Sequence, residues 1–215
     1  MVRKTEQERR AEIIAATIKE VAAAGSLNVT ISQIAKSAGM SAGLTFHYFK
    51  DKDSLFLAAM RDLLRRHGED FCEKLAKAKT PRQRFEAIVH ASFSSPNFTR
   101  EAIYAWLIFY TLALSSADAR RLLYVYQRRL HSNLVFELRS LIGERAPDVA
   151  RRIAGLIDGL YLRYALDENV EDGREAIAHI LRAFDAECRE IQQNENSSVM
   201  GADPSPMDPI SKPQE

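Results

Sequence analysis

Signals that begin and end α-helices recur along this 215-residue chain, and no stretch alternates apolar and polar residues as a strand would. The stretches "TISQ" (30–33) and "TPRQ" (80–83) are capping boxes, in which threonine and glutamine side chains satisfy each other's backbone N–H groups. Gly25 and Gly39 each follow an apolar helical stretch, where glycine commonly ends a helix. The sequence therefore predicts an all-α protein.

Nine helices are expected, and most of the connections between them are short. Their expected positions are a first helix ending at Gly25, 31–38, 41–49, a long helix starting after Asp51, one starting after Thr80, 99–114, 116–142, 147–166 and 171–192. The segment 194–215 is rich in proline, serine, asparagine and acidic residues and has no periodicity. We expect this segment to be a disordered tail.

Composition and charge narrow the classes of function. The net charge is only +1, so charge alone gives no argument for nucleic acid. Cys72 and Cys188 lie far apart without metal-ligand neighbours, which is typical of a reducing compartment. The longest apolar run (102–114) is shorter than the ~20 residues that cross a bilayer, and the charged N-terminus does not resemble a signal peptide. We expect a soluble cytoplasmic protein with no cofactor, no metal and no membrane partner.

An enzyme is the alternative from a different class, and the sequence gives it little support. The histidines are scattered, and no pair of carboxylates, metal ligands or nucleophile and base has a catalytic spacing. We therefore expect no catalytic residues. A purely structural helical dimer is a third alternative, but it leaves the side chains of Phe46 and His47 unexplained.

The segment around residues 31–49 fits a helix-turn-helix motif, with Gly39 in the turn. On the second helix Thr45 and Phe49 are spaced to face inward, whereas Phe46 and His47 face outward. Small residues at the start of this helix would let it approach a surface closely, as in a DNA major groove. These small residues are Ser41, Ala42 and Gly43.

Lys52 gives a second indication of DNA binding. A cation in the first turn of a helix opposes the helix dipole, unless a phosphate is bound there. The hydroxyl groups of Thr30 and Tyr48 could reach phosphates on either side of the recognition helix. Helix-turn-helix arrangements also occur in helical proteins that never touch DNA, so spacing alone leaves both interpretations open.

The segment 30–55, "TISQIAKSAGMSAGLTFHYFKDKDSL", resembles the DNA-binding domain of the tetracycline-repressor (TetR) family. The resemblance rests on a threonine before the first helix, the small residues of the turn, an aromatic cluster ending in phenylalanine, and a lysine three positions later. It implies a three-helix DNA-binding domain (1–52), a helical ligand-binding and dimerisation domain (53–193), and a homodimer on double-stranded palindromic operator DNA.

The resemblance also implies DNA-contacting residues. Two positions depart from the family pattern: Thr45 replaces a larger aliphatic residue, which is expected to loosen packing, and Phe46 replaces a residue with a hydroxyl group. Phe46 could contact a thymine methyl group instead. Family contacts fall on Thr30 and Lys52 for phosphates, and on Ala42, Gly43, Phe46, His47 and Tyr48 for bases or backbone.

Three segments of the second half resemble the choline-responsive, BetI-type group of this family: "YAWLIFYTLAL", "RRLHSNLVFELRSLI" and "LIDGLYLRYAL". This resemblance implies a repressor of glycine betaine synthesis genes that senses choline or a related quaternary ammonium compound. A repressor of efflux genes that senses hydrophobic cations is the alternative within the same class.

Asp158 stands in the apolar stretch "GLIDGLYL", where a buried carboxylate requires a positive partner. That partner could be an arginine of the protein or a cationic ligand, which aromatic rings from several helices would enclose. The candidate arginines are Arg128, Arg129 and Arg163. The candidate ligand-binding residues are Trp106, Phe109, Tyr110, Tyr126, Asp158 and Tyr161, with Asn133 for a ligand hydroxyl; the aromatic residues could equally belong to the core.

The last two helices carry more apolar residues than one core face needs, which predicts a dimer interface. Gly155 and Gly159, four residues apart, would allow close approach of two helices. The apolar residues are Leu156, Ile157, Leu160, Tyr164, Ile177, Ile180, Leu181 and Phe184.

Overall fold

A computed structural model describes residues 4–94, 98–167 and 172–200, and this part of the chain is helical apart from short connections. The all-α class predicted from the sequence is confirmed. The described residues form α1 (Glu6–Ala24), α2 (Ile31–Ser37), α3 (Ala42–Tyr48), α4 (Lys52–Lys77), α5 (Pro81–Phe93), α6 (Arg100–Ser115), α7 (Ala117–Ile142), a 3₁₀ turn η1 (Gly143–Arg145), α8 (Ala146–Ala165) and α9 (Arg174–Met200).

Helix α9 is longer than the sequence predicts. It continues to Met200, so residues 194–200, which composition assigned to a tail, belong to the helix. The remainder of the predicted tail, 201–215, lies outside the described residues. Composition did not exclude this extension, because residues 194–200 include neither proline nor glycine, the residues that most strongly disfavour a helix.

The predicted capping signals are present in the structure. Thr30 and Gln33 form a reciprocal capping box at α2, and Thr80 and Gln83 form another at α5. The carboxylate of Asp51 accepts a hydrogen bond from the backbone N–H of Ser54 and caps α4. Each cap satisfies backbone donors that would otherwise lack partners at the start of a helix.

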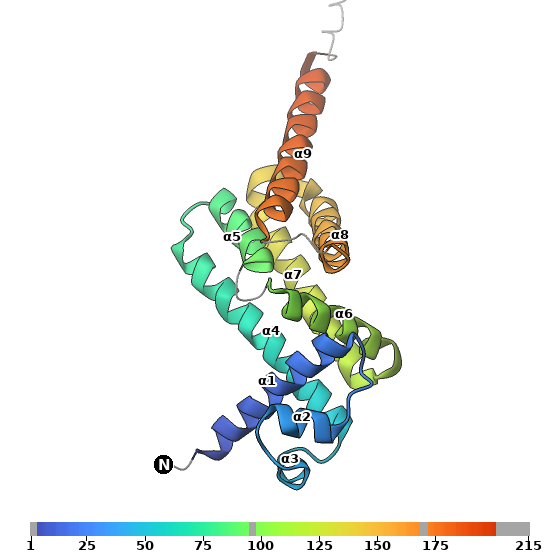
Figure 1. The fold of residues 1–215 in the computed structure, drawn as a ribbon. Helices are drawn as coiled ribbons and strands as arrows, with labels where there is room; N and C mark the ends of the chain where they lie inside the picture. Colours follow the sequence, from blue (N-terminus) through green and yellow to red (C-terminus); the bar gives the residue numbers. More distant parts are fainter. Residues whose placement is uncertain (1–3, 95–97, 168–171, 201–215) are drawn as a thin grey trace, which may run out of the picture.

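The described residues form two hydrophobic cores, built by helices that lie toward opposite ends of the molecule (Figure 1). The first core joins α1, α2 and the start of α4 to the second half of α6 through Phe109, Leu112 and Ala113. The second core lies among α5, α7, α8 and α9 and contains Phe85 and Phe184, whose ring centroids are 4.4 Å apart. Figure 1 shows α1–α3 at one end of the molecule and α9 projecting from the other.

The boundary predicted between residues 52 and 53 falls at the start of α4, inside the part of the chain that forms the first core. Lys52 is the first residue of α4, yet Leu55, Phe56 and Met60 of this helix are buried in the core of α1 and α2. The far end of α4 then packs against α5. Helix α4 is therefore shared by both parts of the molecule.

Three of the residues predicted for a dimer interface lie in the second core instead. Ile157, Ile180 and Phe184 are at most 1% exposed within a single chain. Periodicity could not distinguish a face that packs on α5 and α7 from one that packs on another chain. The other predicted interface residues remain partly or largely accessible: Leu156, Leu160, Tyr164, Ile177 and Leu181.

Within the described ranges, no helix is both long enough and apolar enough to cross a membrane.

Candidate functional site

Helix α3 is anchored by one face and leaves the other accessible. The hydroxyl of Ser41 caps it by accepting a hydrogen bond from the backbone N–H of Leu44. Thr45 and Phe49 are buried, as predicted, at 0% and 4% exposure. The hydroxyl of Thr45 also donates a hydrogen bond to the Ser41 carbonyl, at 3.3 Å. The inner face of α3 is therefore packed against the rest of the molecule.

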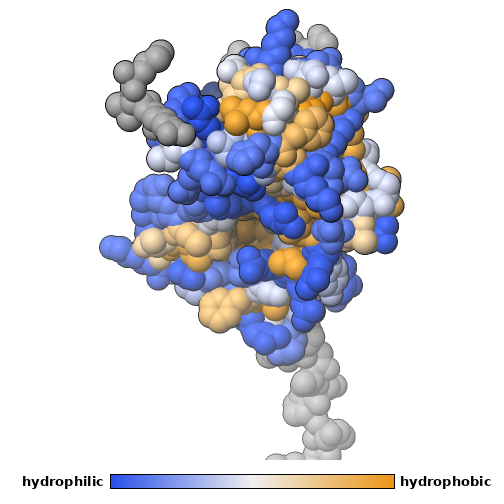
Figure 2. Space-filling view, turned by 90° about the horizontal axis from the view of Figure 1, so that it is seen from below, coloured by the Kyte–Doolittle hydropathy of each residue, from blue (hydrophilic) through white to orange (hydrophobic). Residues whose placement is uncertain are grey.

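The outer face of α3 presents the residues expected to meet DNA. Phe46 is 52% exposed, a high value for a large apolar side chain, and Gly43 and His47 are also exposed. Ala42 and Tyr48 are half-buried, and the Tyr48 ring lies edge-on to that of His47, with centroids 5.3 Å apart. Figure 2 views the molecule from this end and shows a mainly hydrophilic face interrupted by hydrophobic side chains.

The two residues expected at phosphates flank α3. The Lys52 ammonium lies 5.2 Å from the centroid of the Phe56 ring, at the start of α4. The Thr30 hydroxyl donates to the side-chain oxygen of Gln33, at 2.8 Å. A phosphate contact at Thr30 would therefore require the hydroxyl to turn away from its capping partner.

Arg10 is a structural partner of α3 that sequence reasoning missed. Its guanidinium donates a hydrogen bond of 2.6 Å to the backbone carbonyl of Tyr48, at the end of α3, and lies 4.5 Å from the centroid of the Phe49 ring. A carbonyl in the last turn of a helix has no partner within that helix. Nothing in the sequence near Arg10 signals this contact, because the surrounding charged stretch is typical of an exposed helix.

Most of the residues predicted to bind a ligand line a cavity of about 200 Å³ formed by α4, α6, α7 and α8. Four of the predicted aromatic residues line it: Trp106, Tyr110, Tyr126 and Tyr161. The centroids of the Trp106 and Tyr126 rings are 5.2 Å apart, and those of Trp106 and Tyr110 are 6.3 Å apart. The remaining lining residues are Asp158, His67, Leu107, Ile157 and Leu162.

Asp158 is the acidic group of this cavity and has no ion-pair partner among the described residues. None of the three arginines proposed as its partners pairs with it: Arg128 donates to the hydroxyl of Tyr124, and Arg129 and Arg163 are exposed. Its one hydrogen bond comes from the hydroxyl of Tyr110, at 3.0 Å. Burial raises the pKa of the Asp158 carboxyl, and the Tyr110 hydrogen bond opposes this shift.

The tyrosines of the cavity stay protonated. Burial raises the pKa of Tyr110, Tyr126 and Tyr161, and the Asp158 carboxylate adds to each shift. The Tyr161 hydroxyl donates to the backbone carbonyl of Ser92, which fixes the orientation of its ring. The cavity therefore offers neutral aromatic rings and one carboxylate, an arrangement suited to a cation.

Two of the predicted ligand residues lie elsewhere. Phe109 is fully buried in the first core, against the helices of the DNA-binding end. It is close to Trp106 and Tyr110 in sequence, but its ring packs into the first core and does not line the cavity. Asn133 lines a separate cavity between α4 and α7. Sequence spacing predicted that these residues face inward, but it could not predict toward which cavity.

His67 lies between the two cavities and was not predicted. It lines both cavities, and its ring is edge-on to Tyr126, with centroids 5.5 Å apart. Burial lowers the pKa of His67 to about 4, and the charge of Asp70 only partly opposes the shift. The imidazole is therefore neutral near pH 7 and adds no positive charge to the cavity.

We expect Arg10→Lys to weaken specific operator binding by about tenfold or more, because lysine keeps the charge but loses the guanidinium contacts that hold α3. Binding to a scrambled duplex of the same length should change little. Fluorescence anisotropy at one salt concentration would measure both, and Arg9→Lys, on the adjacent residue, is the matched control. An equal loss on both duplexes would instead assign Arg10 to a phosphate contact.

His67 should make stability depend on pH. The unfolded chain takes up the proton near pH 6.5 and the folded chain only near pH 4, so lowering the pH through this window favours unfolding, by about 3 kcal/mol in total. Urea unfolding of wild type and His67→Gln from pH 7 to 4 measures the contribution as a widening difference, and His90→Gln at an exposed site is the control. Parallel curves for wild type and His67→Gln would contradict this assignment.

Comparison with known proteins identifies the family. Residues 13–59 match the model for bacterial regulatory proteins of the tetR family, and residues 81–189 match that for the C-terminal domain of BetI-type transcriptional repressors. The HTH-type transcriptional regulator BetI of Brucella anthropi is 48% identical over 79% of this chain and 88% of its own. BetI of Agrobacterium fabrum is 47% identical over 74% of this chain and 77% of its own.

Solved structures share the fold. A putative transcriptional regulator from Saccharomonospora viridis, in complex with choline, has a TM-score of 0.73 at 22% identity over 82% of this chain and 95% of its own. A TetR transcription regulator from Haloarcula marismortui has a TM-score of 0.74 at 21% identity, over 84% of this chain and 98% of its own. The chain belongs to the TetR family of bacterial transcriptional regulators and carries a BetI-type C-terminal domain.

Proposed function

We propose that this regulator is a repressor that binds choline or a closely related quaternary ammonium compound and controls genes of glycine betaine synthesis. One observation carries the proposal: Asp158 is a largely buried carboxylate without an ion-pair partner among the described residues, in a cavity lined by four aromatic side chains. The chain belongs to a family of transcriptional regulators, and this argues against the alternative that it is an enzyme.

The chemistry of a quaternary ammonium matches this cavity. Such a cation has no N–H group and cannot donate a strong hydrogen bond, so ring faces and a carboxylate must recognise it. Its charge would supply the partner that Asp158 lacks, in a site where water screens the attraction only weakly. The BetI relatives and the choline-bound structure from Saccharomonospora viridis support choline as the effector.

The size of the cavity favours choline over the effectors of efflux regulators. A cavity of about 200 Å³ is small, and the neighbouring rings of Trp106 and Tyr126, with centroids 5.2 Å apart, form part of its wall. Large aromatic cations would require these rings to move apart. The efflux alternative remains distinguishable, because a regulator of that kind would bind bulky cations at least as tightly as choline.

At the DNA-binding end, the repressor would insert α3 into the major groove. Thr30 and Lys52 would contact phosphates on either side of α3. The exposure of α3's outer face supports base or backbone contacts from that face. The groove-facing residues would be Ser41, Ala42, Gly43, Phe46, His47 and Tyr48.

Helix α4 is the proposed connection between effector and DNA. Its residue His67 lines the cavity, its first residue is Lys52, and its first half shares a core with α1. A ligand that fits better when α4 shifts would also move α3. It would lower operator affinity only to the extent that it binds the two arrangements with different free energies.

A homodimer formed through α8 and α9 would place two copies of α3 on a palindromic operator. Leu156 and Leu162 of α8 are 40% and 51% exposed, an apolar surface that another chain could cover. A Cβ added at Gly155 or Gly159 would meet no atom within 4 Å in the single chain. These glycines therefore leave room for a close partner helix.

This geometry predicts that Gly155→Ala combined with Gly159→Ala raises the dimer dissociation constant by about tenfold or more, while the monomer gains helix propensity. Sedimentation over a concentration series would measure it. Gly68→Ala on α4 is the control, because a Cβ there is equally free of contacts in the monomer. A wild-type chain that stays monomeric, or a double variant that dimerises normally, would refute this interface.

Asp158→Asn keeps the side-chain volume and removes the charge. We expect choline affinity to fall by about 1–3 kcal/mol, the range for a hydrogen bond or contact with a charged group, while operator binding without choline stays intact. Isothermal titration with choline and a gel shift on the operator would measure both.

The exposed carboxylate Asp148 on the same helix provides the matched control, Asp148→Asn. Unchanged choline binding by Asp158→Asn would remove the carboxylate from the site. A variant that no longer folds would make Asp158 structural, and Tyr110→Phe, which removes only the hydrogen bond to it, would then test the cavity.

A further inference from the structure

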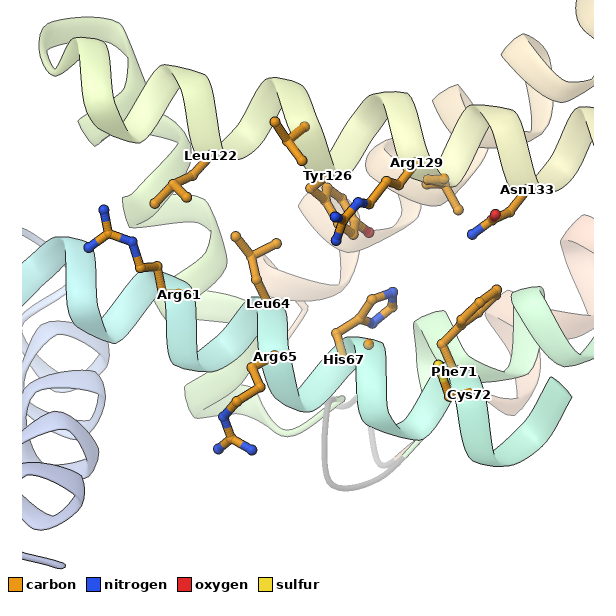
Figure 3. A pocket seen from close by; sticks show the side chains of 13 residues that line it. Arg61, Leu64, Arg65, His67, Phe71, Cys72, Leu122, Tyr126, Arg129 and Asn133 are labelled. Atoms are coloured by element: carbon orange, nitrogen blue, oxygen red, sulfur yellow. The ribbon is translucent and has the colours of Figure 1, made fainter. Parts of the chain in front are cut away.

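A second cavity of about 450 Å³ lies between α4 and α7, next to the effector cavity (Figure 3). Its walls are mostly apolar. Phe71 and Leu64 project from α4, and Leu122 and Leu130 from α7. Apolar walls of this extent favour a ligand with a hydrocarbon portion.

Basic side chains accompany these apolar walls, and no carboxylate lines the cavity. The three arginines are Arg61, Arg65 and Arg129. Arg65 is neutralised by Asp62 and Glu69, each with an N–O distance of 2.7 Å, and Figure 3 shows its guanidinium on the side of α4 away from α7. Arg61 and Arg129 have neither an ion pair nor a hydrogen bond within the described ranges.

The two adjacent cavities therefore have opposite charge. The effector cavity contains Asp158 and no arginine or lysine, whereas the second cavity contains arginines and no acid. His67 and Tyr126 form the wall between them. A cation would be repelled at Arg61 and Arg129, so the second cavity is poorly suited to choline, either as a binding site or as an entrance.

We propose that the cavity between α4 and α7 is a second ligand site, for an amphipathic monoanion with a carboxylate head and a hydrocarbon tail. The head would form paired hydrogen bonds with the guanidinium of Arg129, which Figure 3 shows on α7 beside Tyr126. Arg61, which Figure 3 shows on α4 near Leu122, would add positive charge at the other end of the cavity. The tail would lie against Phe71 and Leu130. Such a ligand would bridge the two helices and so act on α4, the helix that leads to the DNA-binding end.

Decanoate is the probe, and decan-1-ol is its uncharged counterpart. In isothermal titration of the full chain, we expect decanoate to bind at least about tenfold more tightly than decan-1-ol. Arg61→Gln combined with Arg129→Gln should remove this preference. Arg65→Gln is the matched control and should change decanoate affinity less than about twofold, because Asp62 and Glu69 already neutralise that arginine.

Titration with decanoate in the presence of saturating choline tests whether decanoate binds outside the proposed effector cavity. Decanoate should still bind in its presence and form a ternary complex, because the two ligands occupy different cavities. Competition with choline, equal binding of decan-1-ol, or unchanged binding by the Arg61 and Arg129 variant would each overturn the proposal. The same variant should bind choline as tightly as wild type does, which would show that the variant is folded. If choline fails to bind the wild-type protein, the proposed effector is wrong, but the decanoate result still stands.

Discussion

The Asp158 carboxylate, largely withdrawn from water and hydrogen-bonded to a single tyrosine hydroxyl, is the constraint around which the proposed effector cavity is built. A charge in that position is unfavourable unless a cation joins it or a proton neutralises it. The surrounding rings of Trp106, Tyr126 and Tyr161 cannot supply either one. They can stabilise a cation that arrives, and this makes an otherwise costly residue useful for recognition.

The architecture connects the proposed effector cavity to the DNA-binding end through α4 and α6. Helix α4 contributes His67 to the cavity wall and Leu55 to the core of the DNA-binding end, and α6 similarly contributes Trp106 to one and Phe109 to the other. Each of these two helices is unbroken between the residues that line the cavity and the residues that pack in the first core. Arg10 completes the connection, because it fixes the end of α3 to α1, and α1 packs on α6.

Sequence reasoning recovered what local chemistry determines. The capping residues Thr30 and Thr80 correctly predicted where α2 and α5 begin. The spacing of Thr45 and Phe49 predicted which face of α3 is buried, and therefore which face is accessible. The sequence could not predict contacts between elements that are far apart along the chain. Periodicity indicated that Phe109 is buried, but it could not show that Phe109 packs in the core to which α1 contributes. No local sequence signal indicated the contacts of Arg10 or the position of His67 between two cavities.

The most direct test of the central claim compares choline with 3,3-dimethylbutan-1-ol, in which a neutral carbon replaces the nitrogen and the shape is kept. Isothermal titration of the wild-type protein near pH 7 would give both affinities. If Asp158 and the aromatic rings recognise positive charge, choline should bind at least about tenfold more tightly. Equal affinities, or tighter binding of the neutral compound, would contradict the account, because the cavity would then recognise shape and apolar surface alone.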